Sequence, residues 1–342
     1  MRRPTMTDVA RQAGVGVATV DRVINKRAPV KPETAHKVLA AAKALGFRAS
    51  RLIQQRVDEF VPAQRLGFLL HRKSSVFYTE LAAELTAATQ RCDDIAGTAV
   101  VEYAEDMSPA SIVAGIYALA EKADAIAVVS SDHQHVSDCI EHLADKGVPV
   151  IALITDLSAQ RKRGFVGIDH RVAGRTAAWA MCQFSPQPRS VGLVMASHRI
   201  LSQEYSESSF RSYCREHAES INIIDCVISL ENNTMAQQTV STLLQEQPSI
   251  TGLYCIGGGI GGVVQALRQA KPKSLFVICN ELTDITRAAL IDHTIDLVIA
   301  NPRRALAEKT VTAMVNALQH PQQNTKAYEI LAHELFISEN IQ

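Results

Sequence analysis

Three glycines at the start of one segment have a spacing that suits phosphate binding. Gly257, Gly259 and Gly262 form a G-x-G-x-x-G pattern after the apolar run TGLYCIG, and Glu281 lies about 20 residues further along, as in a dinucleotide fingerprint. Backbone amides and a helix N-terminus stabilise a pyrophosphate in such a motif. The pattern leaves two alternatives open: an NAD-dependent oxidoreductase, or a regulator that senses a dinucleotide or phosphorylated ligand. The fingerprint usually begins its fold, whereas here it lies deep in the chain, which argues against the oxidoreductase.

The other reactive side chains predict neither a metal site nor a nucleophilic triad. His133 and His135 lack further ligands at metal spacing, and no G-x-S-x-G occurs. The seven cysteines are isolated, without a C-x-x-C pair, which predicts reduced thiols in a cytoplasmic protein. No apolar run reaches the ~18 residues of a membrane span. We therefore expect no catalytic residue, metal or cofactor, and a protein that is not an enzyme.

A second set of residues near the N-terminus suits the recognition of double-stranded DNA. On a helix expected over 17–25, Val17 and Ala18 are small enough to approach a thymine methyl group. One turn later, Arg22 can donate two hydrogen bonds to guanine. Thr19 and Asn25 are short polar side chains suited to phosphate.

The surrounding pattern predicts a helix-turn-helix domain over residues 1–46. A first helix begins at Thr5 with a capping box to Asp8 and ends at Gly14. A third helix begins at Pro32 and ends at Gly46. The residues expected to face inward are apolar and follow helical spacing: Val9, Ala10, Ala13, Val20, Val23, Ile24, Ala35, Val38, Ala42 and Leu45. Such a domain places its second helix in the major groove.

The charge distribution predicts a polyanionic partner for this domain. Residues 1–56 hold twelve Lys or Arg against three acids, a net charge of +9, and the remaining residues carry −9. A basic head on an acidic body is an electrostatic footprint of nucleic-acid binding.

The segments TMTDVARQAGVGVATVDRVIN and VKPETAHKVLAAAKALGF resemble the N-terminal signature of the lactose-repressor family of bacterial transcription regulators. The resemblance implies a homodimer on a pseudo-palindromic operator, with repression as the usual outcome. It also implies base contacts and phosphate contacts at matching positions: Val17, Ala18 and Arg22 for bases, and Thr5, Thr19, Asn25 and Thr34 for phosphate. Members commonly carry Ser where this chain has Asp21. Because phosphate repels a carboxylate, we expect Asp21 to turn towards Arg22 or Arg11.

Residues 47–62 are expected to be a hinge. By resemblance, a short helix here lies in the minor groove, and the stretch ASRLIQQR suits one, with Ser50 as N-cap and Arg51, Gln54 and Gln55 as polar side chains. At the family's usual leucine wedge this chain has Arg56, which can enter a narrow minor groove. Leu52 or Ile53 are then the candidates for the apolar contact. The alternative is an unstructured linker that does not contact DNA.

Residues 63–342 alternate short apolar runs with helical segments. The runs are RLGFLLH, TAVVEYA, AIAVVSS, PVIALI, FVGID, SVGLVMAS, IIDCVIS, TGLYCIG, SLFVICN and IDLVIA. This pattern predicts an α/β body of two doubly wound parallel-sheet lobes, which by resemblance is of the type I periplasmic-binding-protein kind. FVGIDHRVAGRTAA is expected to mark the first crossover, and a helix over 302–319 to return to the first lobe.

A small-molecule effector is expected between the lobes, where loops leave the carboxyl ends of strands. The candidate ligand-binding residues all follow a predicted strand or open the next helix: His71, Ser75, Phe77, Tyr78, Asp132, His133, Glu204, Ser206, Gly257, Gly259, Asn280 and Glu281. Phe77 and Tyr78 either stack on a ligand ring or form the buried start of a helix.

The chemistry of this effector is left broad, as a sugar, a sugar phosphate or a related metabolite. Sugar-binding relatives tend to have arginine at the position of Ser206, and Asn-Asp where this chain reads CIGGGIGG. Bare amides near Gly259 favour an anion, whereas Glu204 and Glu281 favour a cationic or hydroxyl-rich group. We therefore expect a phosphorylated or amino-bearing metabolite rather than a plain hexose.

Overall fold

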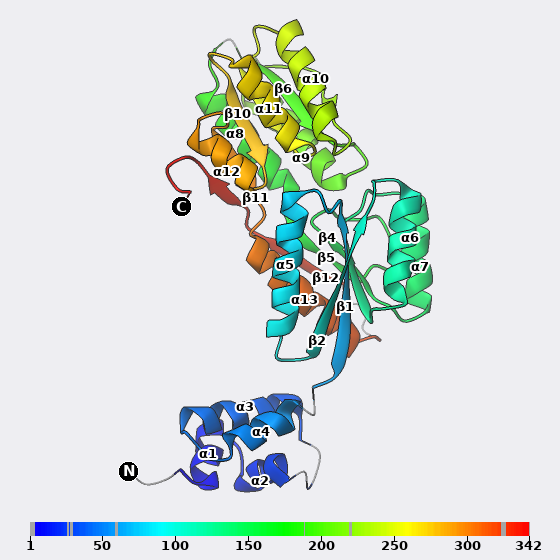
Figure 1. The fold of residues 1–342 in the computed structure, drawn as a ribbon, viewed down its shortest axis with the longest axis vertical. Coiled ribbons are helices and arrows are strands. Elements are labelled where there is room, and N and C mark those ends of the chain that lie inside the picture. Colours follow the sequence, from blue (N-terminus) through cyan, green and yellow to red (C-terminus); the bar gives the residue numbers. More distant parts are fainter. Residues whose placement is uncertain are drawn as a thin grey trace. The chain divides into compact units, whose positions relative to one another are not determined.

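The computed structural model describes residues 4–25, 27, 30–58, 61–187, 189–218, 221–322 and 326–341. The chain forms two compact units, one of Met1–Gln64 with Gln90–Thr98 and one of Arg65–Thr89 with Ala99–Gln342. The first unit contains a helical head over residues 4–58, and the second contains an α/β body with two lobes (Figure 1).

The described part of the head consists of four helices: α1 Met6–Ala13, α2 Val17–Asn25, α3 Pro32–Ala44 and α4 Ser50–Asp58. The predicted capping box begins α1, since the Asp8 amide donates to the Thr5 hydroxyl at 3.4 Å and the Thr5 amide donates to the Asp8 carboxylate at 2.8 Å. Gly14 follows α1 with φ of 66°, a left-handed conformation that favours glycine. Both ends of α1 confirm the sequence prediction.

The residues predicted to face inward form one hydrophobic core in the head. Val9, Val20, Val23 and Val38 are fully buried. The other predicted residues pack with them, either buried or at the margin of the cluster: Ala10, Ala13, Ile24, Ala35, Ala42 and Leu45. The helical period therefore identified both the helices and the faces on which they meet.

Helix α4 differs from the expectation in two details. Ser50 is its first residue rather than its N-cap, because a turn in which the Ser50 amide donates to the Phe47 carbonyl at 2.9 Å leads directly into the helix. Ile53 is fully buried in the head core together with Phe47, so of the two candidates for the apolar minor-groove contact Leu52 is the accessible one. Leu52 keeps 39% of its surface exposed. Residues 50–58 are helical and not an unstructured linker.

The first lobe of the body contains, within the described residues, a six-stranded sheet in the order β12-β5-β4-β3-β1-β2. The strands are β1 Ala63–His71, β2 Ala96–Ala104, β3 Ala125–Val128, β4 Val150–Leu153, β5 Gly164–Ile168 and β12 Ala327–Leu331. The pairs β1–β3, β3–β4, β4–β5 and β5–β12 are parallel. One face is covered by α5 Val76–Arg91 and α13 Arg303–Gln319, and the other by α6 Pro109–Ala120 and α7 Gln134–Asp145 (Figure 1).

The second lobe is built on a seven-stranded sheet, counted over the described chain, in the order β13-β11-β10-β9-β6-β7, with β8 also paired to β6. Its strands are β6 Ser190–Met195, β7 Asn222–Ile223, β8 Val227–Ile228, β9 Gly252–Cys255, β10 Phe276–Asn280, β11 Leu297–Ala300 and β13 Glu334–Phe336. Its helices are α8 His170–Phe184, α9 Leu201–His217, α10 Asn233–Glu246, α11 Ile260–Ala270 and α12 Asp284–Ile291. Two doubly wound lobes are thereby confirmed.

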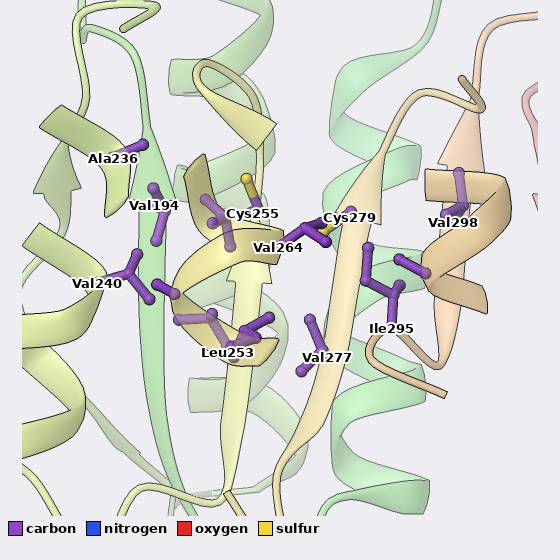
Figure 2. Packing of buried hydrophobic residues seen from close by; sticks show 14 of the residues in the cluster. Val194, Ala236, Val240, Leu253, Cys255, Val264, Val277, Cys279, Ile295 and Val298 are labelled. Carbon is purple, nitrogen blue, oxygen red and sulfur yellow. The ribbon is translucent and has the colours of Figure 1, made fainter. Parts of the chain in front are cut away.

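Alternate residues of the second sheet enter two separate cores. Val194, Cys255 and Cys279 point to the side of α10, α11 and α12 (Figure 2), whereas Leu193 and Tyr254 point to the side of α8 and α9. Both faces of each central strand are therefore buried, which explains why the sequence shows near-continuous apolar runs instead of alternation.

Three details of the body depart from the predicted strands. The run IIDCVIS forms two short strands, β7 and β8, instead of one. The edge strands β12 and β13 were not predicted, because charged residues interrupt the segment KAYEILAHELF and half of it stays exposed. β13 pairs antiparallel with β11 in an otherwise parallel sheet.

The chain passes between the lobes after β5, after β11 and between β12 and β13. FVGIDHRVAGRTAA contains the first of these crossovers, and α13 packs on β3, β4 and β5 of the first lobe, as predicted. None of the helices in the described residues combines the length and apolar character that crossing a membrane requires.

Candidate functional site

A cavity of about 190 Å³ is lined by residues of both lobes, at the carboxyl ends of their strands. Eight of the candidate ligand-binding residues line it: His71, Ser75, Phe77, Tyr78, Gly257, Gly259, Asn280 and Glu281. They end β1 or β10, follow β9 or β10, or lie at the start of α5. Parallel strands bring their carboxyl ends to one edge, which is why loops so distant in sequence meet.

The aromatic candidates adopt two different positions. Phe77 is 8% exposed and forms the buried start of α5, whereas Tyr78 is only half-buried. The Tyr78 ring stacks on the imidazole of His71 at a centroid distance of 5.4 Å, and Phe77 meets Tyr78 edge-on at 5.1 Å. Tyr78 therefore presents the more accessible aromatic surface to the cavity.

Four other candidates do not line this cavity in the described structure. The Asp132 carboxylate accepts from the amide and hydroxyl of Ser158, at 2.9 and 3.0 Å. His133 caps α7, accepting from the His135 amide at 3.1 Å. Ser206 is fully buried and donates to the carbonyl of His170 at 3.2 Å. Glu204 lies one residue beyond Ser202 and Gln203, the two described residues of α9 that line the cavity.

Sequence reasoning missed several polar residues of the cavity, above all Arg72, His170, Gln203 and Glu231. Arg72 adjoins the predicted His71, and His170 opens the helix after the predicted first crossover. The sequence analysis looked for ligand-binding residues at the carboxyl ends of predicted strands. Extending that strand-end rule by one residue would have found these two. Glu231 lies two residues beyond the predicted run IIDCVIS, so an extension of the strand-end rule past that run would also have reached it.

Both histidines of the cavity are neutral imidazoles. Burial lowers the pKa of His71 to about 4 and that of His170 to about 4. The His170 Nε2 lies 2.8 Å from the carbonyl of Ile154, so this nitrogen holds the proton. The Nε2 of His71 is buried and has no hydrogen-bond partner among the described residues.

Two glutamates at the cavity share an unusual backbone conformation and environment. Glu231 has φ of 57° and Glu281 has φ of 69°, a left-handed region that costs roughly 1–3 kcal/mol for such residues. Burial raises the pKa of the Glu231 carboxyl to about 7, with nearby Arg72 opposing it. Burial likewise raises the pKa of Glu281 to about 7, opposed by hydrogen bonds from Asn301.

The glycine-rich turn is shaped by packing against the protein itself. A Cβ on Gly259 would lie 2.6 Å from the Cβ of Ala236, and one on Gly262 would lie 1.8 Å from the carbonyl oxygen of Asn233. Both neighbours belong to α10, which packs directly on α11. The glycines are thus explained by close helix packing, and the dinucleotide fingerprint is not needed to account for them.

Asn280 uses both ends of its amide within the protein. Its Nδ2 donates to the carbonyl of Ile256 at 2.8 Å, and its Oδ1 accepts from the hydroxyl of Tyr254 at 3.4 Å. It therefore fixes the loops after β9 and β10 at the base of the cavity.

The predicted base-contacting residues share one outer face of α2. Val17 is 41% exposed, and Ala18 and Arg22 are exposed as well. Thr19 is half-buried beside them, and Thr5 and Thr34 begin or lie in the first turns of α1 and α3. Because Val20, Val23 and Ile24 hold the inner face in the core, this outer face is presented on a rigid element.

Asp21 does not contact the predicted partners Arg22 and Arg11, so that prediction is wrong. Its carboxylate accepts from the Asn25 amide at 2.7 Å and lies 3.3 Å from the Arg27 guanidinium. The i,i+4 spacing on α2 brings Asn25 to Asp21, whereas Arg22 points elsewhere on the helix. One amide N–H of Asn25 is consequently used within the protein.

The hinge candidates lie along α4. Arg51 is exposed and Gln54 is half-buried. The side chain of Arg56 lies outside the described residues. In the part of the chain that the structure describes, no group of three or more His, Cys, Asp or Glu side chains has metal-binding geometry.

Comparisons with known proteins match both parts of the chain. Residues 66–322 match the family described as "Periplasmic binding protein domain", and residues 5–50 match "Bacterial regulatory proteins, lacI family". Catabolite control protein A of Priestia megaterium is 26% identical over 183 residues, covering 44% of this chain and 54% of that protein. The HTH-type transcriptional regulator GalS of Salmonella typhimurium is 28% identical over 200 residues, covering 57% and 55%. The chain thus spans about half the length of these curated relatives.

A solved structure shares the fold of the body. The solute binding protein of an Agrobacterium vitis ABC transporter, bound to alpha-D-tagatopyranose, superposes with a TM-score of 0.74 at 16% identity, covering 81% of this chain and 95% of that chain. At this identity the likeness shows the two-lobed fold of the body.

Proposed function

This chain belongs to the lacI family of bacterial regulatory proteins, with a periplasmic binding protein domain as its body, and we propose that it regulates transcription from a specific DNA operator. In this proposal a small molecule between the two lobes sets the affinity of the head for the operator. The protein acts in the cytoplasm as a homodimer, each protomer contributing one head to a pseudo-palindromic site, and it performs no catalysis.

One observation carries the DNA-binding half of the proposal. Helix α2 buries Val20 and Val23 in a compact core and exposes Val17, Ala18 and Arg22 on its opposite face. This is the residue set that reads thymine methyl groups and guanine edges in a major groove. The net charge of +9 over residues 1–56 supplies attraction to phosphate that does not depend on sequence.

The ligand-binding half is supported by the cavity between the lobes. Polar groups from loops of both sheets converge there around the rings of His71 and Tyr78. A ligand that contacts both lobes favours one relative position of them, and this difference in affinity is what couples binding to a distant site.

The proposal is tested by selecting duplexes from a randomised pool with the full chain, then measuring affinity for the enriched sequence by fluorescence anisotropy over a range of salt concentrations. We expect one enriched motif with two-fold symmetry. We also expect a steep fall of affinity with salt, because each neutralised phosphate adds about 0.9 to the log–log slope. An unenriched pool or a flat salt dependence would overturn the DNA-binding proposal.

A further inference from the structure

The wall of the cavity contains two carboxyl groups, which accept hydrogen bonds and carry a negative charge when they are ionised. Glu231, after β8, and Glu281, after β10, both line the cavity. Burial raises the pKa of the Tyr78 hydroxyl, and the charges of Glu231 and Glu281 raise it further. Two loops of the second lobe and one aromatic residue of the first therefore line the same cavity.

Neighbouring amides orient both carboxyl groups and leave them further acceptor capacity. The Gln203 Oε1 accepts from the amide of Ala196 at 2.7 Å, so its Nε2 is the donor to Glu231. Glu281 accepts from Asn301 twice, from Nδ2 at 2.5 Å and from the backbone amide at 3.3 Å. Because an ionised carboxylate has about four acceptor sites, each can bond a ligand as well.

An unpartnered imidazole adds a third acceptor to the cavity wall. His71 is only 3% exposed and bonds the backbone at Val129, while its Nε2 has no partner among the described residues. Its lowered pKa keeps the ring neutral, with a single N–H. Because the ring donates that N–H to the backbone at Val129, the Nε2 is an unprotonated acceptor, which a ligand donor would satisfy.

The cations around the cavity are fewer than its acids. Among the described lining residues, Arg72 is the one Lys or Arg side chain. Its charge already opposes the raised pKa of Glu231. The Arg72 Nε is buried without a hydrogen-bond partner among the described residues, so it suits one acceptor group of a ligand. The two carboxyl groups, when ionised, outnumber this guanidinium and stabilise a cation.

We propose that the cleft binds a small hydroxylated molecule that carries a protonated amine, with the ammonium group at Glu231 and Glu281 and the carbon skeleton against Tyr78. This inference rests on the proposed function and names the ligand class of the same site. Ser75 and Thr155, which also line the cavity, suit the ligand's hydroxyl groups.

Ammonium binding at these acids has a proton signature. The titratable or charged groups facing the ammonium position are His71, Arg72, Tyr78, His170, Glu231 and Glu281. Both histidines are neutral near pH 7, and the glutamates, with pKa near 7, are partly protonated. A bound cation favours the ionised carboxylates, so binding at pH 7 should release protons, and a neutral polyol should release fewer.

The test uses matched triplets of compounds on the full chain: D-glucose, D-glucosamine and D-glucose 6-phosphate; the galactose series; and sorbitol, 1-amino-1-deoxysorbitol and sorbitol 6-phosphate. Thermal shift ranks the compounds, and calorimetry in buffers of different ionisation enthalpy counts the protons released. We expect an amine to bind most tightly in at least one triplet and to release protons. Tighter binding of the neutral or phosphorylated member, or no binding by any amine, would overturn the inference.

Matched variants test the two carboxyl groups. Glu231→Gln and Glu281→Gln keep the side-chain shape and should each weaken the best amine about 10- to 100-fold, the range for a hydrogen bond to a charged group. Glu246→Gln, at the exposed end of α10, should leave its affinity unchanged. If Glu231→Gln and Glu281→Gln bind the best amine as tightly as the unmodified chain does, the placement of the ammonium group at these two carboxyl groups is refuted.

Operator binding separates this inference from the proposed function. An amine that binds the cleft and leaves DNA affinity unchanged supports the ligand class and contradicts effector control. A neutral sugar or phosphate that binds and changes DNA affinity contradicts the ligand class and supports effector control.

Discussion

Replacing Gly259 by alanine should destabilise the second lobe, because two independent costs meet at this residue. Its φ of 69° lies in the left-handed region, where an L side chain costs about 1–2 kcal/mol. The added Cβ would also lie 2.6 Å from the Cβ of Ala236 and 2.8 Å from the carbonyl oxygen of Asn232. Both atoms belong to the start of α10, which has little room to move because Ala236 is fully buried.

The magnitude follows from adding the two costs. Overpacking of a filled interior typically costs about 1–3 kcal/mol, so the total should be about 2–5 kcal/mol. Gly261→Ala is a matched control two residues further along, in the first turn of α11, where the atoms nearest to the new Cβ belong to the side chain of Asn233, at 3.2 Å, and φ is not positive. This control should be neutral or gain roughly 0.5–1 kcal/mol from helix propensity.

Urea denaturation followed by tryptophan fluorescence measures the free energy of unfolding of the second lobe. The chain has a single tryptophan, Trp179 on α8 of the second lobe. With a slope of about 2–3 kcal/mol per molar urea, the midpoint of Gly259→Ala should fall by about 0.7–2.5 M. If Gly259→Ala is as stable as Gly261→Ala, the glycines are not required by packing and the phosphate-binding interpretation regains support.

Three further predictions concern the head and the cleft. Arg22→Ala should relax base preference at one position of each half-site and cost about 1–3 kcal/mol per contact, and an unchanged motif in randomised-duplex selection would contradict it. Ile53→Ala should destabilise the head by about 2–5 kcal/mol, measured as its own transition in calorimetry of the full chain, whereas the exposed Leu52→Ala should change it by less than about 0.5 kcal/mol. Because the folded pKa of Glu281 is raised to about 7, its stabilising contribution is complete below the ordinary pKa of 4.5 and is lost as the pH rises through 7. Glu281→Gln should therefore flatten the decline of Tm between about pH 5 and 8, and an identical decline in both proteins would argue against it.

The features predicted well from the sequence are those fixed by local chemistry. Thr5, Asp8 and Gly14 define α1 because capping and left-handed termination act within a few residues. The apolar runs predicted the central strands for a similar reason, since strands buried on both faces need nearly continuous apolar sequence. The edge strands β12 and β13 are half-exposed, so their sequence carries no such signal.

The cleft was predicted at the level of loops but not of individual side chains. The sequence placed a ligand residue at the start of α9, yet Gln203 lines the cavity and its neighbour Glu204 does not. Successive residues of a helix differ in direction by about 100°, so an error of one position moves a side chain away from the site. The prediction after β3 is also wrong by two positions. Ser130 lines the cavity, whereas the carboxylate of Asp132 accepts a hydrogen bond from the amide of Ser158.

Two residues that line the cleft are connected to segments at which the chain passes between the lobes. His170 directly follows the first crossover, and its Nε2 holds the carbonyl of Ile154. The Glu281 carboxylate accepts a hydrogen bond from Asn301, which directly follows β11 at the second crossover. A ligand that changes the charge of Glu281 therefore acts on a hydrogen bond to a segment whose backbone must turn if the lobes move. Since hinge closure is absorbed by a few residues at element ends, the cleft chemistry and the lobe position should be coupled through Asn301. Asn301→Ala should then weaken the effect of ligand on operator affinity more than it weakens ligand binding itself, and an equal loss of both would show that Asn301 only positions Glu281.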